Sequence, residues 1–402
     1  MIYLGDIPKE ILDKHWEYFE NSIGYKKIEE YKKQNALPIK QRALFRFISN
    51  HDLLKKIIIG KPIEIRELID KYNELVINKG RIVSNDAFAF YKDFIVTGGW
   101  NSIWVKINRD AAGLSNKKNI KARMIYLDKR FSSMERLYGQ VNNERLNIGT
   151  LKSRFDNINN NISSNLESWN DLLKSIFDYS KFIEISDNWN AYKYTTDLGV
   201  TVCPYCNRNY IHTLETDSGR TRAELDHFYP KSLYPFLSIS IYNLIPSCHI
   251  CNSNLKGSKN FFEEQHIHPF ENLNQSKITF KLQYTDLKIE TVIPNINQFE
   301  IDFNFNPSLN NSEMTMINNS LKTFKTKELY NNHKDIAQEL VYKAYYYNKT
   351  KIEELQSILG TNSGIDENFI ERVVYGNYIH ENNFGKRPLA KFTGEILSDL
   401  EN

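Results

Sequence analysis

The sequence lacks the features that would place it in or across a membrane. Its 402 residues contain no apolar run near the roughly 20 residues that a membrane span needs, and the best stretch, residues 53–60, is interrupted by two lysines. The first residues, MIYLGD, have neither the basic n-region nor the apolar h-region of a secretory signal. We therefore expect a soluble, cytoplasmic chain.

Nucleotide-hydrolysis and sequence-reading motifs are also missing. There is no G-x-x-x-x-G-K-[ST] phosphate loop, so the chain should not hydrolyse ATP by itself. No helix-turn-helix or C₂H₂ finger is evident, which argues against strict sequence specificity on DNA.

The net charge is only +3 and does not by itself indicate a nucleic-acid partner. The charge is uneven, however, because residues 101–155 hold twelve basic residues against four acidic ones. Such an excess can bind phosphates and release counterions. A solvated helix surface or a partner-binding face would have the same composition, and this alternative stays open.

Cysteine is scarce, and its placement is informative. All four cysteines fall into two C-x-x-C pairs, Cys203/Cys206 and Cys248/Cys251. Two such pairs form the tetrahedral thiolate set of a structural zinc site, which adds folding energy without chemistry. Two disulfides or a redox pair are the alternatives, but a reducing cytosol and two matched pairs favour zinc.

An Asp226-His227 pair lies between the cysteine pairs, in the segment E-L-D-H-F-Y-P-K. It is followed by Y-N-L-I-P-S-C, which contains Asn243, and by C-N-S-N-L-K-G, which contains Asn252. The order D-H-x-x-P, N-L-x-x-x-C-x-x-C-N, K-G over residues 203–260 closely resembles the HNH (ββα-metal) endonucleases that carry a zinc knuckle. The resemblance implies hydrolysis of phosphodiester bonds.

The roles that the resemblance implies agree with the chemistry of the residue types. An imidazole with an ordinary pKa of about 6.5 suits His227 to activate water. The carboxylate of Asp226 and the amide oxygen of Asn252 are ligands that Mg²⁺ or Mn²⁺ accepts, and Asn254 is the fallback because Lys256 follows Asn252 at four residues rather than the usual three. Asn243 would brace the loop and orient His227; its alternative is an ordinary turn asparagine.

Several nearby polar residues could have either a functional or a purely structural role. Lys231, Lys256 and Arg208 are candidates for phosphate contact or for plain solvent exposure. Glu224 lies two residues before Asp226, so on a strand both carboxylates would share a face. The His266-x-His268 pair has metal-binding spacing, but we favour a structural role, since the site already has a base and a zinc set.

We expect an α+β, mainly helical protein with a ββα-metal (HNH) core and structural zinc, a helical N-terminal domain and a mixed α/β C-terminal region. The domains are residues 1–160, 161–270 and 271–402. Period-3.6 spacing predicts helices from Pro8 and around residues 65–75, and helical periodicity resumes over residues 166–198 after an Asn-rich linker at 157–165. Alternation predicts strands at 278–282 and 299–303, and spacing predicts helices at 314–329, at 337–359 and at the C-terminus.

Among HNH families, C-P-Y-C-N-R, E-L-D-H-F-Y-P-K and the late K-R-P-L-A-K (residues 386–391) most resemble the nuclease subunits of Septu-type and retron-linked anti-phage systems. That resemblance implies an ABC-type ATPase partner, with the helical N-terminal region as a docking surface. DNA is the first candidate substrate, and tRNA or other RNA is the alternative. A non-catalytic zinc-ribbon binding module, in which Asp226-His227 is incidental, remains the alternative from another class.

Overall fold

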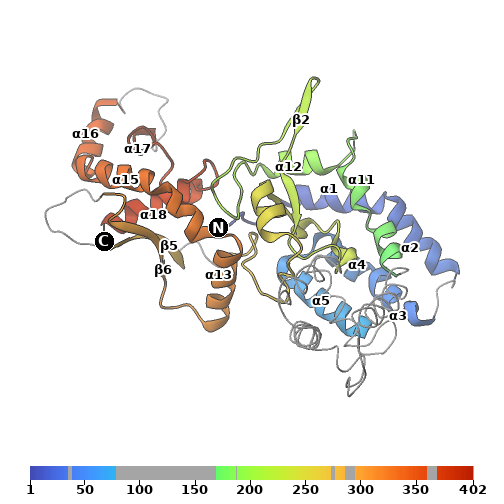
Figure 1. Cartoon of the computed structure of the whole chain (residues 1–402). Coiled ribbons are helices and arrows are strands. Elements are labelled where there is room, and N and C mark those ends of the chain that lie inside the picture. Colours follow the sequence, from blue (N-terminus) through green and yellow to red (C-terminus); the bar gives the residue numbers. More distant parts are fainter. Residues whose placement is uncertain are drawn as a thin grey trace, which may run out of the picture.

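The computed structural model describes residues 1–34, 39–77, 169–186, 188–272, 277–285, 295–359 and 369–401. It has the expected α+β, mainly helical architecture, with short two-stranded sheets among many helices (Figure 1). The basic stretch at 101–155 and the Asn-rich linker at 157–165 lie outside the described residues. None of the described helices is both long and apolar enough to cross a bilayer.

Five N-terminal helices open the chain, and both predicted helices of this region are confirmed. The helix expected from Pro8 begins directly after that proline, and the residue 65–75 spacing lies within a longer helix. The five are α1 (Lys9–Glu20), α2 (Ile23–Gln34), α3 (Ile39–Ser49), α4 (His51–Ile59) and α5 (Pro62–Ile77). Their apolar stripes are buried, as Ile11 and Phe19 of α1 illustrate, so amphipathic periodicity decides this part of the fold.

The helical run expected over 166–198 is divided by capping side chains. A helix covers residues 169–176, and α11 (Tyr179–Ile183) and α12 (Ala191–Leu198) follow. Asp178 accepts hydrogen bonds from the first N–H groups of α11, and Asn190 does the same for α12. These side chains satisfy the free N–H groups of a helix start, and each one therefore begins a new helix.

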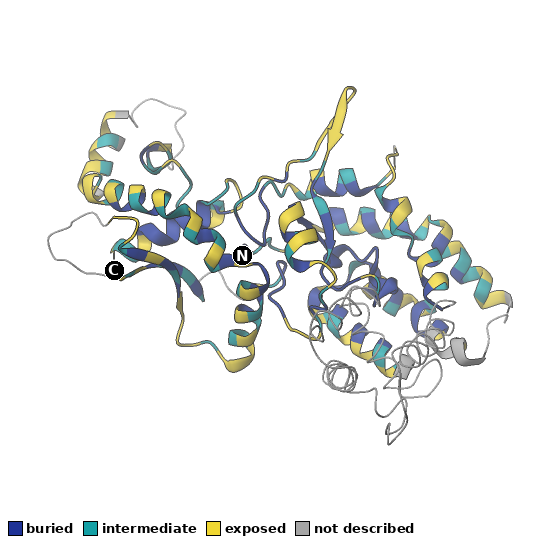
Figure 2. Cartoon of the chain, viewed as in Figure 1, coloured by how far each residue is buried: buried dark blue, intermediate teal, exposed yellow. Residues whose placement is uncertain are grey.

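Three short antiparallel pairs make up the sheet structure. The pair β1 (Leu214–Thr216) and β2 (Gly219–Thr221) is a fully exposed hairpin that projects from the body (Figure 2). The pair β3 (Glu224–His227) and β4 (Leu244–Ser247) places Asp226 opposite Ile245 and His227 opposite Leu244. A helix, η3 (Ile250–Lys256), follows β4 directly. Short turns η1 (Pro235–Leu237) and η2 (Ile241–Asn243) join β3 to β4.

In the C-terminal region the two predicted strands pair as β5 (Ile278–Tyr284) and β6 (Phe299–Phe305). Both long predicted helices are broken in two, the first at Lys325, which has a left-handed φ of 50°, and the second after Tyr346. The helices are α13 (Asn311–Thr323), α14 (Thr326–Tyr330), α15 (Lys334–Tyr346), α16 (Lys349–Leu359), α17 (Phe369–Tyr375) and α18 (Ala390–Glu401), with turns η4 (Asn331–His333) and η5 (Glu381–Asn383).

Two hydrophobic cores organise the described residues. The first joins the N-terminal helices to the segment around β3 and β4, and its members run from Ile7 to Phe270, with Phe324 added. The second lies between the β5–β6 pair and helices α13, α15 and α18. The candidate site therefore rests on the same core as α1, α3, α4 and α5.

Candidate active site and metal centre

The four cysteines predicted to bind zinc lie together and are buried. All four Sγ atoms lie within 4.8 Å of one another, and the Cys206 and Cys248 sulfurs are 3.9 Å apart. Four sulfur atoms at this spacing can bind one tetrahedral cation, which would hold all four as thiolates. The donor set, four thiolates in two C-x-x-C turns, fits a structural zinc.

Backbone and amide N–H groups surround these sulfurs. The N–H of Arg208 donates to Cys206 Sγ at 3.4 Å, and the N–H of Cys248 donates to Cys203 Sγ at the same distance. The side-chain amide of Asn209 donates to Cys248 Sγ at 3.3 Å. Such donors stabilise thiolates and orient them toward a metal, so the hydrogen bonds to the sulfurs also agree with zinc.

The C-terminal motif K-R-P-L-A-K packs against the first cysteine pair. Asn207, at a left-handed φ of 51°, donates through Nδ2 to the Phe384 carbonyl at 2.9 Å and accepts at Oδ1 from the Lys391 N–H at 3.0 Å. The Leu389 N–H also donates to the Asn207 carbonyl. The turn that presents two zinc ligands therefore also anchors the start of α18.

Helix η3 explains the unusual spacing between Asn252 and Lys256. The N–H of Gly257 donates to the Asn252 carbonyl at 2.8 Å, a five-residue step typical of a π-helix. A π-helix takes up one residue more per turn than an α-helix. It therefore accommodates Asn254 and still turns Lys256 toward β3, where the Nζ atom reaches the His227 carbonyl at 2.7 Å.

The His227 imidazole is held at the end of β3. Its Nε2 atom lies 2.9 Å from the Ser238 carbonyl, an acceptor, so Nε2 carries the proton and Nδ1 presents a lone pair. The Tyr179 ring packs edge-on against it, with centroids 4.6 Å apart. Burial, with the nearby charge of Lys231, lowers the pKa of His227 to about 3. The imidazole is thus neutral at physiological pH, but in this buried arrangement it is a weaker base than the ordinary pKa of about 6.5 predicts.

Asn243 ties together the two ends of the loop that carries these groups. Its Oδ1 atom accepts from the Tyr229 N–H at 2.7 Å, and its Nδ2 atom donates to the carbonyls of Tyr229 and Leu237, each at 3.0 Å. The side chain is fully buried. Asn243 contacts backbone on both sides of the loop, and the Leu237 carbonyl that it binds directly precedes Ser238, the partner of His227.

Asp226 lies in a buried ion pair. Its Oδ1 atom is 2.9 Å from Lys256 Nζ, with both side chains only 2% exposed, and its Oδ2 atom accepts from the Tyr205 hydroxyl at 2.6 Å. The Asn252 amide instead donates to Glu224 at 2.8 Å. The ammonium of Lys256 already balances the Asp226 carboxylate. A divalent cation therefore does not fit on Asp226 and Asn252 unless Lys256 moves away.

The Glu224 carboxylate forms several hydrogen bonds at the surface end of β3. Its carboxylate bonds His249 Nδ1 at 2.6 Å and the Asn252 amide, and the Ser253 hydroxyl is 3.3 Å away. Burial alone would raise the pKa of Glu224, but the His249 and Asn252 hydrogen bonds outweigh burial, and the pKa lies below its ordinary value. Glu224 is therefore an anion that links β3 to η3.

The remaining predicted residues fall into different environments. Lys231 is exposed beside Tyr179, with Nζ 4.4 Å from the ring centroid, and its position near His227 suits contact with a phosphate. Arg208 donates to His333 Nε2 at 3.0 Å and is half-buried. His266 and His268 are both buried; His266 stacks on Phe261 and His268 packs at a tilt against Phe228, which agrees with a structural role.

The sequence analysis did not identify the residues that hydrogen-bond to Asp226 and to the loop between β3 and β4. Tyr205, within the first C-x-x-C turn, binds Asp226, and its place in that turn was an available signal. His15 of α1 bonds the Ile239 carbonyl through Nε2 at 2.7 Å and accepts from Trp189 Nε1 at 3.0 Å. Only the folded chain reveals these contacts, because more than 170 residues separate His15 from Trp189.

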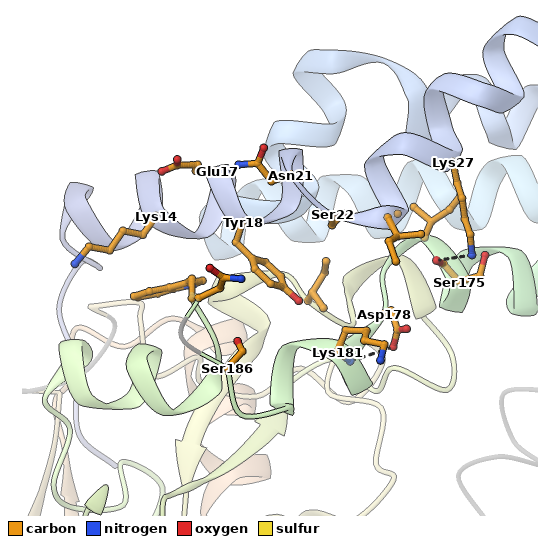
Figure 3. Close-up of a pocket in the computed structure, with 16 residues that line it drawn as sticks. Lys14, Glu17, Tyr18, Asn21, Ser22, Lys27, Ser175, Asp178, Lys181 and Ser186 are labelled. Carbon is orange, nitrogen blue, oxygen red and sulfur yellow. Dashed lines mark hydrogen bonds between the residues drawn. The ribbon is translucent and has the colours of Figure 1, made fainter. Parts of the chain in front are cut away.

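A pocket of about 740 Å³ lies behind the Ser238–Ile239 turn. Figure 3 shows Tyr18 of α1 pointing into it and Lys27 of α2 reaching the Ser175 carbonyl, at 3.3 Å. Ile239 lines this pocket, whereas the preceding Ser238 carbonyl holds His227. The turn thus separates the pocket from the imidazole.

Comparison with known proteins gives partial matches. No family model matches the chain, and no solved structure matches it. The chain is 39% identical over 70 residues to Protein ea31 of Escherichia phage lambda, covering 17% of this chain and 20% of that protein. It is 30% identical over 103 residues to Septu protein PtuB of Bacillus thuringiensis, covering 25% of this chain and 37% of that protein. The chain thus spans well under half the length of either relative, and it has distant similarity to a Septu defence protein.

Proposed function

We propose that this chain is an HNH-type endonuclease, a phosphodiester hydrolase that acts as an effector in anti-phage defence. The observation that carries the proposal is the orientation of the His227 imidazole at the end of β3, where Nε2 bonds the Ser238 carbonyl and Nδ1 is the proton acceptor. The Asp226-His227 motif, the β3–β4–η3 order and the cysteine centre support it. The similarity to Septu protein PtuB supports the role in defence.

The chain's own residues have defined tasks in this proposal. His227 Nδ1 takes a proton from the attacking water, while the Nε2–H···O bond to Ser238 stabilises the imidazolium that forms. Lys231 places positive charge beside the attacked phosphate. Asn243 fixes the loop, and the zinc centre fixes the turn that holds Tyr205 against Asp226.

Mg²⁺ or Mn²⁺, expected from the resemblance at Asp226 and Asn252, would supply charge neutralisation on the phosphate when bound. Lys256 holds the Asp226 carboxylate in the structure, so its ammonium must move away before a cation can bind there. The roles of Lys256 and Arg208 in phosphate contact remain predictions, as does Asn252 or Asn254 as a ligand.

Parallel cleavage assays test the proposal and its alternatives. Purified protein is incubated with plasmid DNA and with total tRNA, with Mg²⁺, with Mn²⁺ and with EDTA. Cutting of DNA supports the first candidate substrate, and cutting of tRNA alone supports the RNA alternative. Zinc-loaded, folded protein that cuts neither would favour the binding-module reading. A second assay, co-purification with an ABC-type ATPase, tests the proposed partner.

A further inference from the structure

Three cationic side chains converge on one tyrosine ring in the C-terminal region. The charged groups of Arg372, Lys386 and Arg387 lie 5.0, 5.2 and 5.4 Å from the Tyr378 ring centroid. We call these four residues the Tyr378 cluster. Lys386 and Arg387 are exposed, and no carboxylate among the described residues forms an ion pair with either of them.

The backbone that carries the cluster is fixed from two sides. On one side Asn377 Nδ2 donates to the Pro388 carbonyl at 2.8 Å. On the other side Asn207 bonds Phe384 and Lys391, and the Thr201 hydroxyl donates to the Gly385 carbonyl at 3.2 Å. Two exposed cations are thus presented by an anchored segment rather than by a mobile loop. Pre-organised cations lose less entropy when they bind an anion.

The energetics of the cluster favour an oxyanion ligand. The aromatic ring attracts the exposed cations Lys386 and Arg387, but their like charges repel one another. An anion placed among them would convert this repulsion into attraction, and the planar guanidinium groups match phosphate oxygens. Within the part of the chain that the structure describes, no base-reading element accompanies the cations, which suits a repeated, sequence-independent anion.

We propose that the Tyr378 cluster binds backbone phosphates of duplex DNA next to the first zinc knuckle. The inference rests on the proposed endonuclease function and extends it. Asn207 follows Cys206 and bonds directly to the segment that bears Lys386 and Arg387. Tyr205 of the same turn donates to Asp226, the neighbour of His227, so hydrogen bonds connect this segment to the candidate site.

The test measures DNA affinity in the full chain. A labelled DNA duplex is titrated with His227→Ala protein, which avoids cleavage, and with the same protein carrying Lys386→Ala and Arg387→Ala. The matched control carries Lys26→Ala and Lys33→Ala, which remove two exposed charges from α2. We expect the cluster variant to bind at least about tenfold more weakly and its slope of log K against log salt to become shallower by about 2, because two phosphate contacts are lost.

Equal affinity and equal slope in the cluster variant and the control would overturn the proposal. Absence of duplex binding by the parent protein at low salt would overturn it too. If DNA binding is unchanged but an ATPase partner no longer co-purifies, the cluster is a protein-docking surface and the proposal falls. A cleavage assay on Lys386→Ala/Arg387→Ala protein that retains His227 separates the two claims. If this protein still cuts and its DNA affinity is unchanged, the nuclease proposal stands and the cluster proposal falls.

Discussion

At the scale of single residues, the ion pair between Asp226 and Lys256 is the feature that departs most from expectation. Lys256 was a candidate for phosphate contact, and Asp226 for a metal ligand, yet the two side chains neutralise each other out of contact with water. Removing one member of a buried pair leaves an uncompensated charge, which costs about 3–5 kcal/mol. A divalent cation on Asp226 would therefore compete with the Lys256 ammonium.

Substitution of Lys256 by alanine tests this competition. We expect Lys256→Ala to lower the free energy of unfolding by about 3 kcal/mol without added metal, because the Asp226 carboxylate loses its partner. Millimolar Mn²⁺ should then raise the melting temperature of the variant more than that of the wild type, since a cation can replace the ammonium. Lys231→Ala, at an exposed position, is the control. If Mn²⁺ raised the melting temperatures of Lys256→Ala and the wild type equally, the result would argue against a cation site at Asp226.

At the scale of elements, η3 and the loop between β3 and β4 show what the sequence could and could not predict. The C-x-x-C pairs indicate a four-sulfur centre directly, because spacing alone determines which thiols can share a metal. The strands at 278–282 and 299–303 followed from alternation. The extra residue before Lys256 was visible, but its accommodation in a π-helix was not, because it depends on the buried contact with Asp226. Helix breaks at Lys325 and after Tyr346 were missed because apolar periodicity continues across them.

The contact between α1 and the active-site loop gives a pH-dependent prediction. Burial lowers the pKa of His15 to about 4, so below the unfolded-state value of about 6.5 the unfolded chain binds a proton that the folded chain does not. The contribution of neutral His15 to the free energy of unfolding is fully present above pH 6.5. It is lost as the pH falls toward 4, at about 1.4 kcal/mol per pH unit.

Urea unfolding at pH 7, 6 and 5 measures this loss. His15→Gln should have a lower free energy of unfolding than the wild type at pH 7. Its free energy of unfolding should fall less steeply as the pH drops below 6.5, and the two slopes should differ by about 1.4 kcal/mol per pH unit. Because zinc release also destabilises at low pH, only the difference between the two proteins is informative. His51→Ala, at an exposed histidine, should leave the wild-type slope unchanged. Parallel pH profiles for His15→Gln and the wild type would contradict the account.

At the scale of the whole molecule, Asn207 and the Tyr330 hydroxyl bond the C-terminal region to the first C-x-x-C turn, and Met1 packs against both hydrophobic cores. The domain boundary near residue 160 remains a prediction, because it lies outside the described residues. Within those residues, the N-terminal helices and the β3–β4 segment share one core. The sequence could not reveal this, because it arises from contacts between segments far apart in the chain.

Asn207 offers a test of how the C-terminal region is joined to the knuckle. Asn207→Gly keeps the left-handed backbone but removes the bonds to Phe384 and Lys391, which we expect to cost about 2–4 kcal/mol. The urea transition should become biphasic, with the C-terminal core unfolding first. Asn382→Gly, at an exposed position, is the control. A single transition at the wild-type midpoint would show that these bonds do not couple the two cores.

The central claim is that His227 is the base of a phosphodiester hydrolase. The most direct measurement is the rate of plasmid nicking by wild-type, His227→Ala and His51→Ala proteins of equal zinc content and equal melting temperature. We predict that His51→Ala cuts at the wild-type rate and that His227→Ala is slower by about 10²-fold or more, because general-base catalysis contributes that much. Nicking by His227→Ala at the wild-type rate would contradict the mechanism.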